Sequence, residues 1–469
     1  LRGEGFTSGF TTYVRNASVI ADYDGSATSN TLVSMFSRAN YSVRDRYLFS
    51  ASLRRDGSSR FGASERWGMF PAASVGWLLT DEGFAHGLSR FGSLKLRASY
   101  GVTGNQGIGD FAALSLARGT PYGSAPGIVA YQLGNADLRW ETTRETDFGA
   151  DLSLLNGRLG IIADYYARKT TDLLVSRPIP ALSGFTSVWS NVGAIQNKGV
   201  DLGIQTINIK PSSPRGFGWN SDLNLTFNHN KVLSLYGGQP IITGINGRQT
   251  SIAAVGQPLG EFYMYKFLSV DPTDGNAIFA KAGGGTTKSP GTADKMFVGS
   301  PHPKYYGGFT NTMTLGSFDA RGVLTFSKGN KIFNMMRIFT DDGGCTWDNL
   351  TTNVLARWQK AGDVTNVPRM SYDCTSGADL ISSRFVEDGS YVRLDELTLG
   401  YKLPFHFGSL ARSDARLYVS GRNLHLWTKY SGYNPDVNSA GSGSNIVMGT
   451  DYYAYPLPRT VSVGINASW

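Results

Sequence analysis

The sequence predicts an all-β fold, an antiparallel transmembrane β-barrel, on three observations. The chain of 469 residues has 58 glycines and 12% aromatic residues but only 17% charged residues, which is typical of many strands joined by many turns. Most segments alternate apolar and polar residues, so each expected strand has one apolar and one polar face. Short and long connections alternate along the chain, and bacterial outer-membrane barrels gather their long loops at one end.

The final stretch, Thr460 to Trp469, shows the alternation most clearly. Its apolar side carries Val461, Val463, Ile465, Ala467 and Trp469. Its other side is small and polar. A strand of about ten residues can cross a bilayer when it is tilted. This stretch alone fits an amphipathic strand of a soluble sandwich equally well, so the prediction depends on the same pattern recurring.

The pattern recurs in the first hundred residues. The strands expected there are Thr31 to Val43, Tyr47 to Arg55, Trp67 to Leu79 and Ser93 to Gly101. The polar turn Arg44-Asp45-Arg46 joins the first two, and a long Gly-rich loop follows the last. Each of these strands places its polar residues on one side and its apolar residues on the other.

The clearest hairpin follows this loop. Asp147 to Leu154 and Leu159 to Ala167 both alternate, and Asn156-Gly157 between them is a type I′ turn signal. Strands around Val200 to Ile204 and Leu223 to Phe227 come next. Between residues 233 and 303 we expect one further hairpin, made of residues 262–270 and 277–282.

The remaining strands surround a large insertion. Residues 309–315 turn through Gly316-Ser317 into residues 318–326, and an insertion of residues 329–389 follows, with a short helix expected near residues 349–359. In the strand Tyr391 to Leu403 the apolar register shifts at Asp395-Glu396, which predicts a β-bulge. Strands at residues 417–419 and 460–469 complete a total of about fifteen strands.

Charges and aromatics fit a wall that faces lipid on one side. A charge pointing into lipid at mid-membrane costs about 2–4 kcal/mol. The polar register holds Lys95, Arg97, Asp147, Asp151, Asp164 and Arg168. Aromatics near strand ends, as a girdle requires, are Tyr47, Trp77, Tyr100, Tyr165 and Tyr401. Because short and long connections alternate along the chain, we expect the short turns at the periplasmic end and the long loops at the extracellular end, with the last strand running toward the periplasm.

Other functions find little support in the composition. The formal net charge is +8, but the lysines and arginines are scattered and do not predict nucleic-acid binding. The histidines show no metal-ligand spacing, no catalytic constellation is present, and no cofactor is expected. The two cysteines, Cys345 and Cys374, would close a loop of about 30 residues, which fits a disulfide in an oxidising compartment better than a zinc site.

Aromatic residues in the expected loops are candidates for binding. They are Trp347, Trp358, Tyr372, Trp427, Tyr430 and Tyr433. These rings could stack on sugars or contact a lid protein. The alternative, that they pack the loops against one another, is the more favoured interpretation.

Several motifs are characteristic when taken together. They include residues 47–62 with Arg54-Arg55-Asp56-Gly57-Ser58-Ser59-Arg60-Phe61-Gly62, residues 70–77 (Phe-Pro-Ala-Ala-Ser-Val-Gly-Trp), residues 94–106, Asn191-Val192-Gly193, residues 255–260, residues 387–394 and Gly421-Arg422-Asn423-Leu424. In these motifs, from about Thr31 to Trp469, the chain resembles SusC/RagA-type TonB-dependent outer-membrane transporters.

This resemblance implies a 22-stranded barrel with an N-terminal plug and a TonB-binding segment. It also implies a SusD-like surface lipoprotein as lid, TonB as energy-coupling partner, contact with outer-membrane lipids, and import of oligosaccharides or peptides. Insertion by the barrel-assembly machinery would use a C-terminal signal that includes Val463, Ile465 and Trp469.

The plug and first strands of such a transporter are not in the sequence, so residues 1–469 are expected to be the C-terminal portion of one barrel domain. Two alternatives stay open. One is a passive outer-membrane receptor or pore without TonB energisation, or an outer-membrane barrel enzyme. The other is a soluble all-β binding protein.

Overall fold

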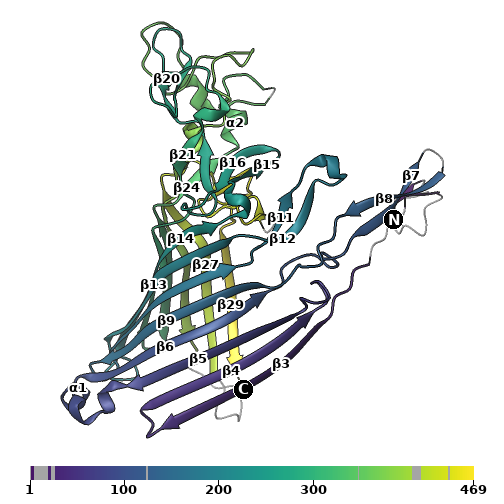
Figure 1. Cartoon of the computed structure of the whole chain (residues 1–469). Coiled ribbons are helices and arrows are strands. Elements are labelled where there is room, and N and C mark those ends of the chain that lie inside the picture. The colour runs from purple at the N-terminus through teal and green to yellow at the C-terminus, as the bar shows by residue number, and fades with distance from the viewer. Residues whose placement is uncertain are drawn as a thin grey trace.

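The large sheet is a single antiparallel wall. The computed structural model describes residues 2–4, 19–22, 27–122, 125–346, 348–403, 414–441 and 444–468. Among these, thirteen strands form one sheet in the order β29-β27-β26-β23-β22-β14-β13-β10-β9-β6-β5-β4-β3 (Figure 1). Their bounds are β3 (Leu32–Val43), β4 (Tyr47–Ser58), β5 (Trp67–Leu78), β6 (Gly92–Asn105), β9 (Glu141–Leu154), β10 (Leu159–Thr171), β13 (Ala194–Ile209), β14 (Phe217–Ser234), β22 (Tyr305–Leu315), β23 (Phe318–Lys328), β26 (Tyr391–Lys402), β27 (Asp414–Thr428) and β29 (Thr460–Ser468).

Smaller elements lie in the connections. The short strands are β1 (Arg2–Glu4), β2 (Val19–Asp22), β7 (Leu116–Tyr122), β8 (Ala125–Gln132), β11 (Leu174–Pro178), β12 (Ser187–Asn191), β15 (Ile241–Ile245), β16 (Arg248–Ala253), β17 (Glu261–Met264), β18 (Phe267–Val270), β19 (Ala277–Ala280), β20 (Thr286–Thr287), β21 (Met296–Gly299), β24 (Lys331–Asn334), β25 (Val386–Asp388) and β28 (Thr450–Asp451). The helices are α1 (His86–Ser89) and α2 (Arg337–Thr340), with 3-10 turns η2 (Leu79–Asp81), η3 (Gly83–Ala85), η4 (Ala181–Ser183), η5 (Tyr236–Gly238), η6 (Thr292–Asp294), η7 (Thr352–Ala356) and η8 (Ser383–Phe385).

Most of the connections divide by length between the two ends of the sheet, as expected; the exception is residues 59–66, a short connection that joins β4 to β5 at the end of the long loops. Residues 44–46, 79–91, 155–158, 210–216 and 316–317 join strands at the lower end in Figure 1, where α1 lies. Residues 106–140, 172–193, 235–304, 329–390 and 429–459 join strands at the opposite end, where most of the small sheets lie. We call this the long-loop end.

One face of the sheet is apolar across strand after strand. Residues directly opposite one another on paired strands share a face. One such row consists of Tyr41, Phe49, Val75, Ala98, Phe148, Tyr165, Val200 and Phe227. Phe148 is 56% exposed and Tyr165 45% exposed, so no other layer of the described chain covers this row. An uncovered apolar face of this extent fits a membrane and does not fit the dry interior of a sandwich.

The opposite face is polar and tied together by ion pairs across the strands. Arg97 on β6 bonds Asp151 at 2.7 Å and reaches past β9 to Asp164 on β10 at 2.8 Å. The position that it crosses on β9 is Gly149, where a Cβ would collide with the Asp164 carboxylate and lie 2.7 Å from the Arg97 guanidinium. Gly149 therefore leaves room for a polar bridge over three strands.

Three details complete the comparison with the expected strands. The hairpin expected at residues 262–282 belongs to small sheets in the long loops, which is why the main sheet has thirteen strands and not about fifteen. Glu396 pairs with Val323 and Leu394 with Leu324, so Asp395 is the extra residue of the expected bulge. The helix expected near residues 349–359 is the 3-10 turn η7. Among the described residues, no helix is long and apolar enough to cross a membrane.

Candidate functional site

Three long connections fold together at the long-loop end. We call residues 235–304, 329–390 and 429–459 the loop hub. Its buried core contains Phe262, Met264, Phe333, Met335, Ile338 and Phe385, each at most 3% exposed. The rings of Phe262 and Phe333 lie 6.2 Å apart between centroids and join the first connection to the second. These loops therefore have a hydrophobic core of their own, separate from the wall of the sheet.

Backbone pairing joins the second connection to the third. β24 pairs with β25 in antiparallel and with β28 in parallel. The N–H of Phe333 donates to the carbonyl of Gly449, and the N–H of Met335 donates to that of Asp451, both at 2.9 Å. Strands that are more than a hundred residues apart in the sequence thus form one small sheet under the loops.

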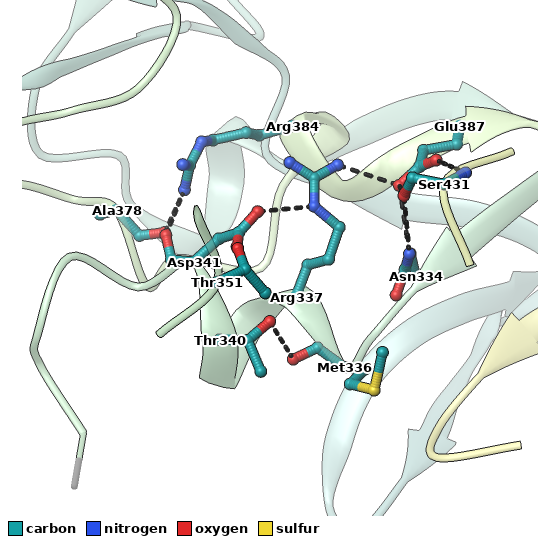
Figure 2. A network of polar contacts seen from close by, with 10 residues as sticks. All are labelled: Asn334, Met336, Arg337, Thr340, Asp341, Thr351, Ala378, Arg384, Glu387 and Ser431. Carbon is teal, nitrogen blue, oxygen red and sulfur yellow. Dashed lines mark hydrogen bonds and ion pairs between the residues drawn. The ribbon is translucent and has the colours of Figure 1, made fainter. Parts of the chain in front are cut away.

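A buried charged network lies beside this core, and Figure 2 shows it. Arg337 on α2 donates to Asp341 at 2.7 Å and to Glu387 on β25 at 2.9 Å. The Asp341 side chain is 0% exposed and also accepts from the Thr351 hydroxyl. Glu387 in turn accepts from the backbone N–H of Ser431 at 2.8 Å. The network therefore connects α2 and β25 with the third connection.

The two arginines of the network, Arg337 and Arg384, stay charged despite burial. Burial alone would lower the pKa of Arg337, but the hydrogen bonds and charges of Asp341 and Glu387 outweigh it and raise that pKa. Burial lowers the pKa of Arg384 to about 10, still well above neutrality, and its guanidinium donates to the carbonyls of Asp341 and Ala378 at 3.0 Å. A buried ion that keeps its charge has to keep its partners, so these contacts hold the loops in one arrangement.

Two further polar contacts fasten the hub. The hydroxyl of Tyr430, which is 5% exposed, donates to Asp451 at 2.6 Å, and burial is the main cause that raises its pKa. The ring of His302 lies with Nε2 2.7 Å from the Leu259 carbonyl. Burial lowers the pKa of His302, so the neutral imidazole donates this bond.

Cys345 and Cys374 are joined by a disulfide in the second connection, with Cα atoms 5.0 Å apart. The disulfide-bonded segment rests on the first connection, because Arg369 donates to Asn276 at 3.0 Å. The Asp379 carboxylate lies near the two sulfurs, but sulfurs joined to each other are not thiolates and do not ligate metal as thiolates do.

The candidate loop aromatics separate into different environments. Tyr430 is buried, and Trp358 is half-buried with its indole N–H donating to the Pro272 carbonyl at 3.0 Å. Trp427 lies within β27 and not in a loop, and its ring centroid is 4.4 Å from that of His425, with the two ring planes tilted by 59°. Tyr372 is 75% exposed and Tyr433 66% exposed. Trp347 lies outside the described residues.

The last strand is exposed along its apolar side. Val463 is 71% exposed and Ile465 59% exposed on β29, which pairs with β27. Trp469 lies outside the described residues.

The charged network was not expected from the sequence. Arg337 and Asp341 are four residues apart in the stretch Phe333 to Asp341, whose other residues are mostly apolar. A charge pair at this spacing inside an apolar run is the signal that could have indicated a buried ion pair.

A second buried cluster packs the loops above β4 to β9 against one another. Phe61, Leu138 and Trp140 are buried together, with rings of Phe61 and Trp140 5.0 Å apart. Arg60 bonds Asp110 at 2.8 Å beside them. This cluster and the loop hub both lie at the long-loop end of the sheet, beyond its polar face. Such an arrangement is suited to binding and passing a polar solute.

Comparisons with known proteins give a consistent result. Residues 2–424 match the family described as "TonB dependent receptor-like, beta-barrel". The chain is 33% identical to TonB-dependent receptor P3 of Formosa agariphila, over 99% of this chain and 49% of the relative. It is 32% identical to TonB-dependent receptor SusC of Bacteroides thetaiotaomicron, over 94% of this chain and 44% of the relative.

Among solved structures, that of the RagAB peptide transporter is similar. The likeness has a TM-score of 0.87 at 26% identity and covers 98% of this chain and 50% of that chain. The chain thus spans about half the length of the curated relatives that it matches.

Proposed function

The chain belongs to the TonB-dependent receptor-like β-barrel family, and from that premise we propose that it forms barrel wall and extracellular loops of a SusC-like importer of nutrients. This family consists of receptors and transporters of the outer membrane and not of enzymes. The observation that carries the proposal is the separation of the two faces: one carries the uncovered apolar row that includes Val75 and Phe148, and the other carries the ion-paired row that includes Arg97 and Asp164. In the proposed barrel the first face contacts lipid and the second lines a polar lumen.

The proposed cargo is an oligosaccharide or a peptide. The similar solved structure is described as a peptide transporter, and the related SusC is described as a TonB-dependent receptor. A lumen lined with paired charges such as Arg97 and Asp151 suits a polar, hydrated solute. Exposed rings such as Tyr433 offer flat faces for a sugar or a peptide.

The proposed partner on the outside is a SusD-like lipoprotein acting as a lid. The loop hub supports this because the first and second connections share one buried core and a charged network joins the second connection to the third, so they form a firm platform and not separate flexible loops. The residue 329–389 insertion is the proposed extracellular part that meets the lid, stiffened by the Cys345–Cys374 disulfide. TonB would act through segments of the complete protein outside residues 1–469.

The proposed assembly signal is the end of the chain. Val463 and Ile465 expose an apolar side on β29, and the barrel-assembly machinery would recognise this strand together with Trp469 during insertion.

The experiment is an uptake measurement in the source bacterium. Cells carrying the complete gene, with or without its TonB-binding segment, are given labelled oligosaccharides and labelled peptides. Import that stops when the segment is deleted, with the protein still present in the outer membrane, supports the proposal. Undiminished uptake would instead establish the second candidate, a passive pore.

A further inference from the structure

Basic side chains gather on the lipid-facing side of the wall at its extracellular end. We call the following set the basic rim: Arg144 on β9, Lys169 on β10, Lys198 on β13, Lys231 on β14 and Lys328 on β23. All are exposed. Each lies toward the long-loop end of its strand.

The pairing register places the rim on the same face as the apolar row. Phe148, Tyr165, Val200 and Phe227 lie directly opposite one another on successive strands. Two residues closer to the loops, the row on these strands reads Thr146, Ala167, Lys198 and His229. Two residues further, it reads Arg144, Lys169, Gln196 and Lys231. Since a strand rises about 3.3 Å per residue, the face changes from apolar to basic within about 13 Å along the strand.

The rim cations contrast with the cations of the lumen. On the lumen side, Arg97 bonds Asp151 at 2.7 Å and Arg168 bonds Glu145 at 2.9 Å. Within the part of the chain that the structure describes, no carboxylate oxygen lies within the 4.0 Å ion-pair distance of a rim lysine or arginine. The rim cations therefore lack a direct carboxylate partner among the described residues.

The rim also includes a repulsive pair. Arg144 and Lys169 are directly opposite each other on β9 and β10, and like charges in that position destabilise a sheet. Lys198 and His229 are opposite each other on β13 and β14. An anion held between these strands would turn this repulsion into attraction.

Hollows below and between the rim cations are lined by aromatic rings. Lys198 and His229 line one hollow together with Tyr165 and Phe227. Lys328 and Lys429 line another together with Trp427. Asp388 also lines the second hollow, where the Ser390 hydroxyl donates to it at 2.6 Å. Cations above an aromatic and aliphatic wall match a lipid whose anionic headgroup lies above its acyl chains.

We propose that the basic rim binds the phosphate groups of a phosphorylated glycolipid in the outer leaflet, with the acyl chains lying along the apolar row. The occupant is a lipid because the cations continue directly into an apolar, uncovered wall. Lys169 and Lys231 are separated by Gln196, a distance of about 10 Å across two strand spacings, so one headgroup with two phosphates can contact both.

The test uses the complete gene product purified from outer membranes in detergent. The rim variant carries Lys169→Gln, Lys198→Gln and Lys231→Gln. The matched control carries Lys210→Gln, Arg215→Gln and Lys402→Gln, which removes the same charge at exposed positions near the periplasmic end. Bisphosphorylated lipid A, dephosphorylated lipid A and inorganic phosphate are added separately, and bound lipid is counted by native mass spectrometry alongside the thermal midpoint.

We expect bisphosphorylated lipid A to bind the wild type and the control equally, and to bind the rim variant at least 10-fold more weakly. Equal binding of dephosphorylated lipid A, or an equal rise of the midpoint with inorganic phosphate alone, would overturn the proposal. A rim variant that loses self-association and keeps its lipid would show that the surface meets a second copy, which also overturns it. The single variant Lys169→Gln, expected to bind more weakly by a smaller factor, serves if the triple variant does not insert.

Discussion

Removing Arg337 should loosen the loop hub without affecting the barrel wall. In Arg337→Met the aliphatic stem is kept, but Asp341 and Glu387 lose the guanidinium that lies 2.7 Å and 2.9 Å from them. The Asp341 side chain is 0% exposed, so water cannot replace the lost partner. Breaking a buried pair by removing one member costs about 3–5 kcal/mol.

Hydrogen–deuterium exchange of the complete protein in nanodiscs measures this cost locally. A loss of that size speeds exchange through hub opening by about two to four orders of magnitude, at about 1.4 kcal/mol per factor of ten. We expect the faster exchange at β24 and β25 and unchanged exchange in β9 and β10. The control Arg321→Met removes a pair with Glu396 in which the arginine is 48% exposed, which should cost about 0–1 kcal/mol.

A compensating variant distinguishes uncompensated charge from lost packing. Adding Asp341→Asn and Glu387→Gln to Arg337→Met removes all three charges of the ion-pair triad, while Arg384 keeps its bonds to the carbonyls of residue 341 and Ala378, so most of the protection should return. Unchanged exchange at β24 in Arg337→Met alone would refute the conclusion that the network holds the second and third connections together.

Further predictions concern the wall, the disulfide and pH. Gly149→Ala should destabilise the barrel by about 1–3 kcal/mol through overpacking and so lower its thermal midpoint. Gly160→Ala should leave the midpoint unchanged, because the atom nearest to the added Cβ would lie 3.7 Å away. Replacing Cys345 and Cys374 by Ser opens a loop with a sequence separation of 29, costs about 3–4 kcal/mol locally, and should allow proteolysis within that loop while the barrel stays folded. Burial lowers the pKa of His302, so the unfolded segment binds the extra proton first and stability falls as pH drops below about 6.5. Between pH 7 and 5 the protection factors of amides near residue 302, from which the pH dependence of chemical exchange has been divided out, should fall in the wild type and not in His302→Gln.

The face of the sheet on which each side chain lies could be determined from the sequence, because alternation along a strand is a local, repeating property. Side chains alternate every residue along a strand, so Phe148 and Asp147 are assigned to opposite faces without knowledge of any partner strand. The extra residue at Asp395 was visible for the same reason, as a change of parity. The hairpin expected at residues 262–282 was assigned to the wall incorrectly, because alternation does not state which sheet a strand joins.

The candidate site was much less accessible from the sequence. Loop aromatics were grouped by residue type, but the structure buries Tyr430 and places Trp427 on a strand of the wall. The charged network around Arg337 was missed because Glu387 lies 50 residues further along the same connection and Ser431 comes from the next one.

The sequence by itself determined that this chain is a β-wall with one face for lipid, one face for water and long loops at one end, because each of these follows from order along the chain. Only the tertiary structure decided how the long loops combine. Asn334 contacts Ser431 across 97 residues, and the Glu387 carboxylate collects partners from two connections. Such contacts depend on how the sheet curves and where its strands end. The periodicity of the sequence predicts neither the curvature nor the contacts.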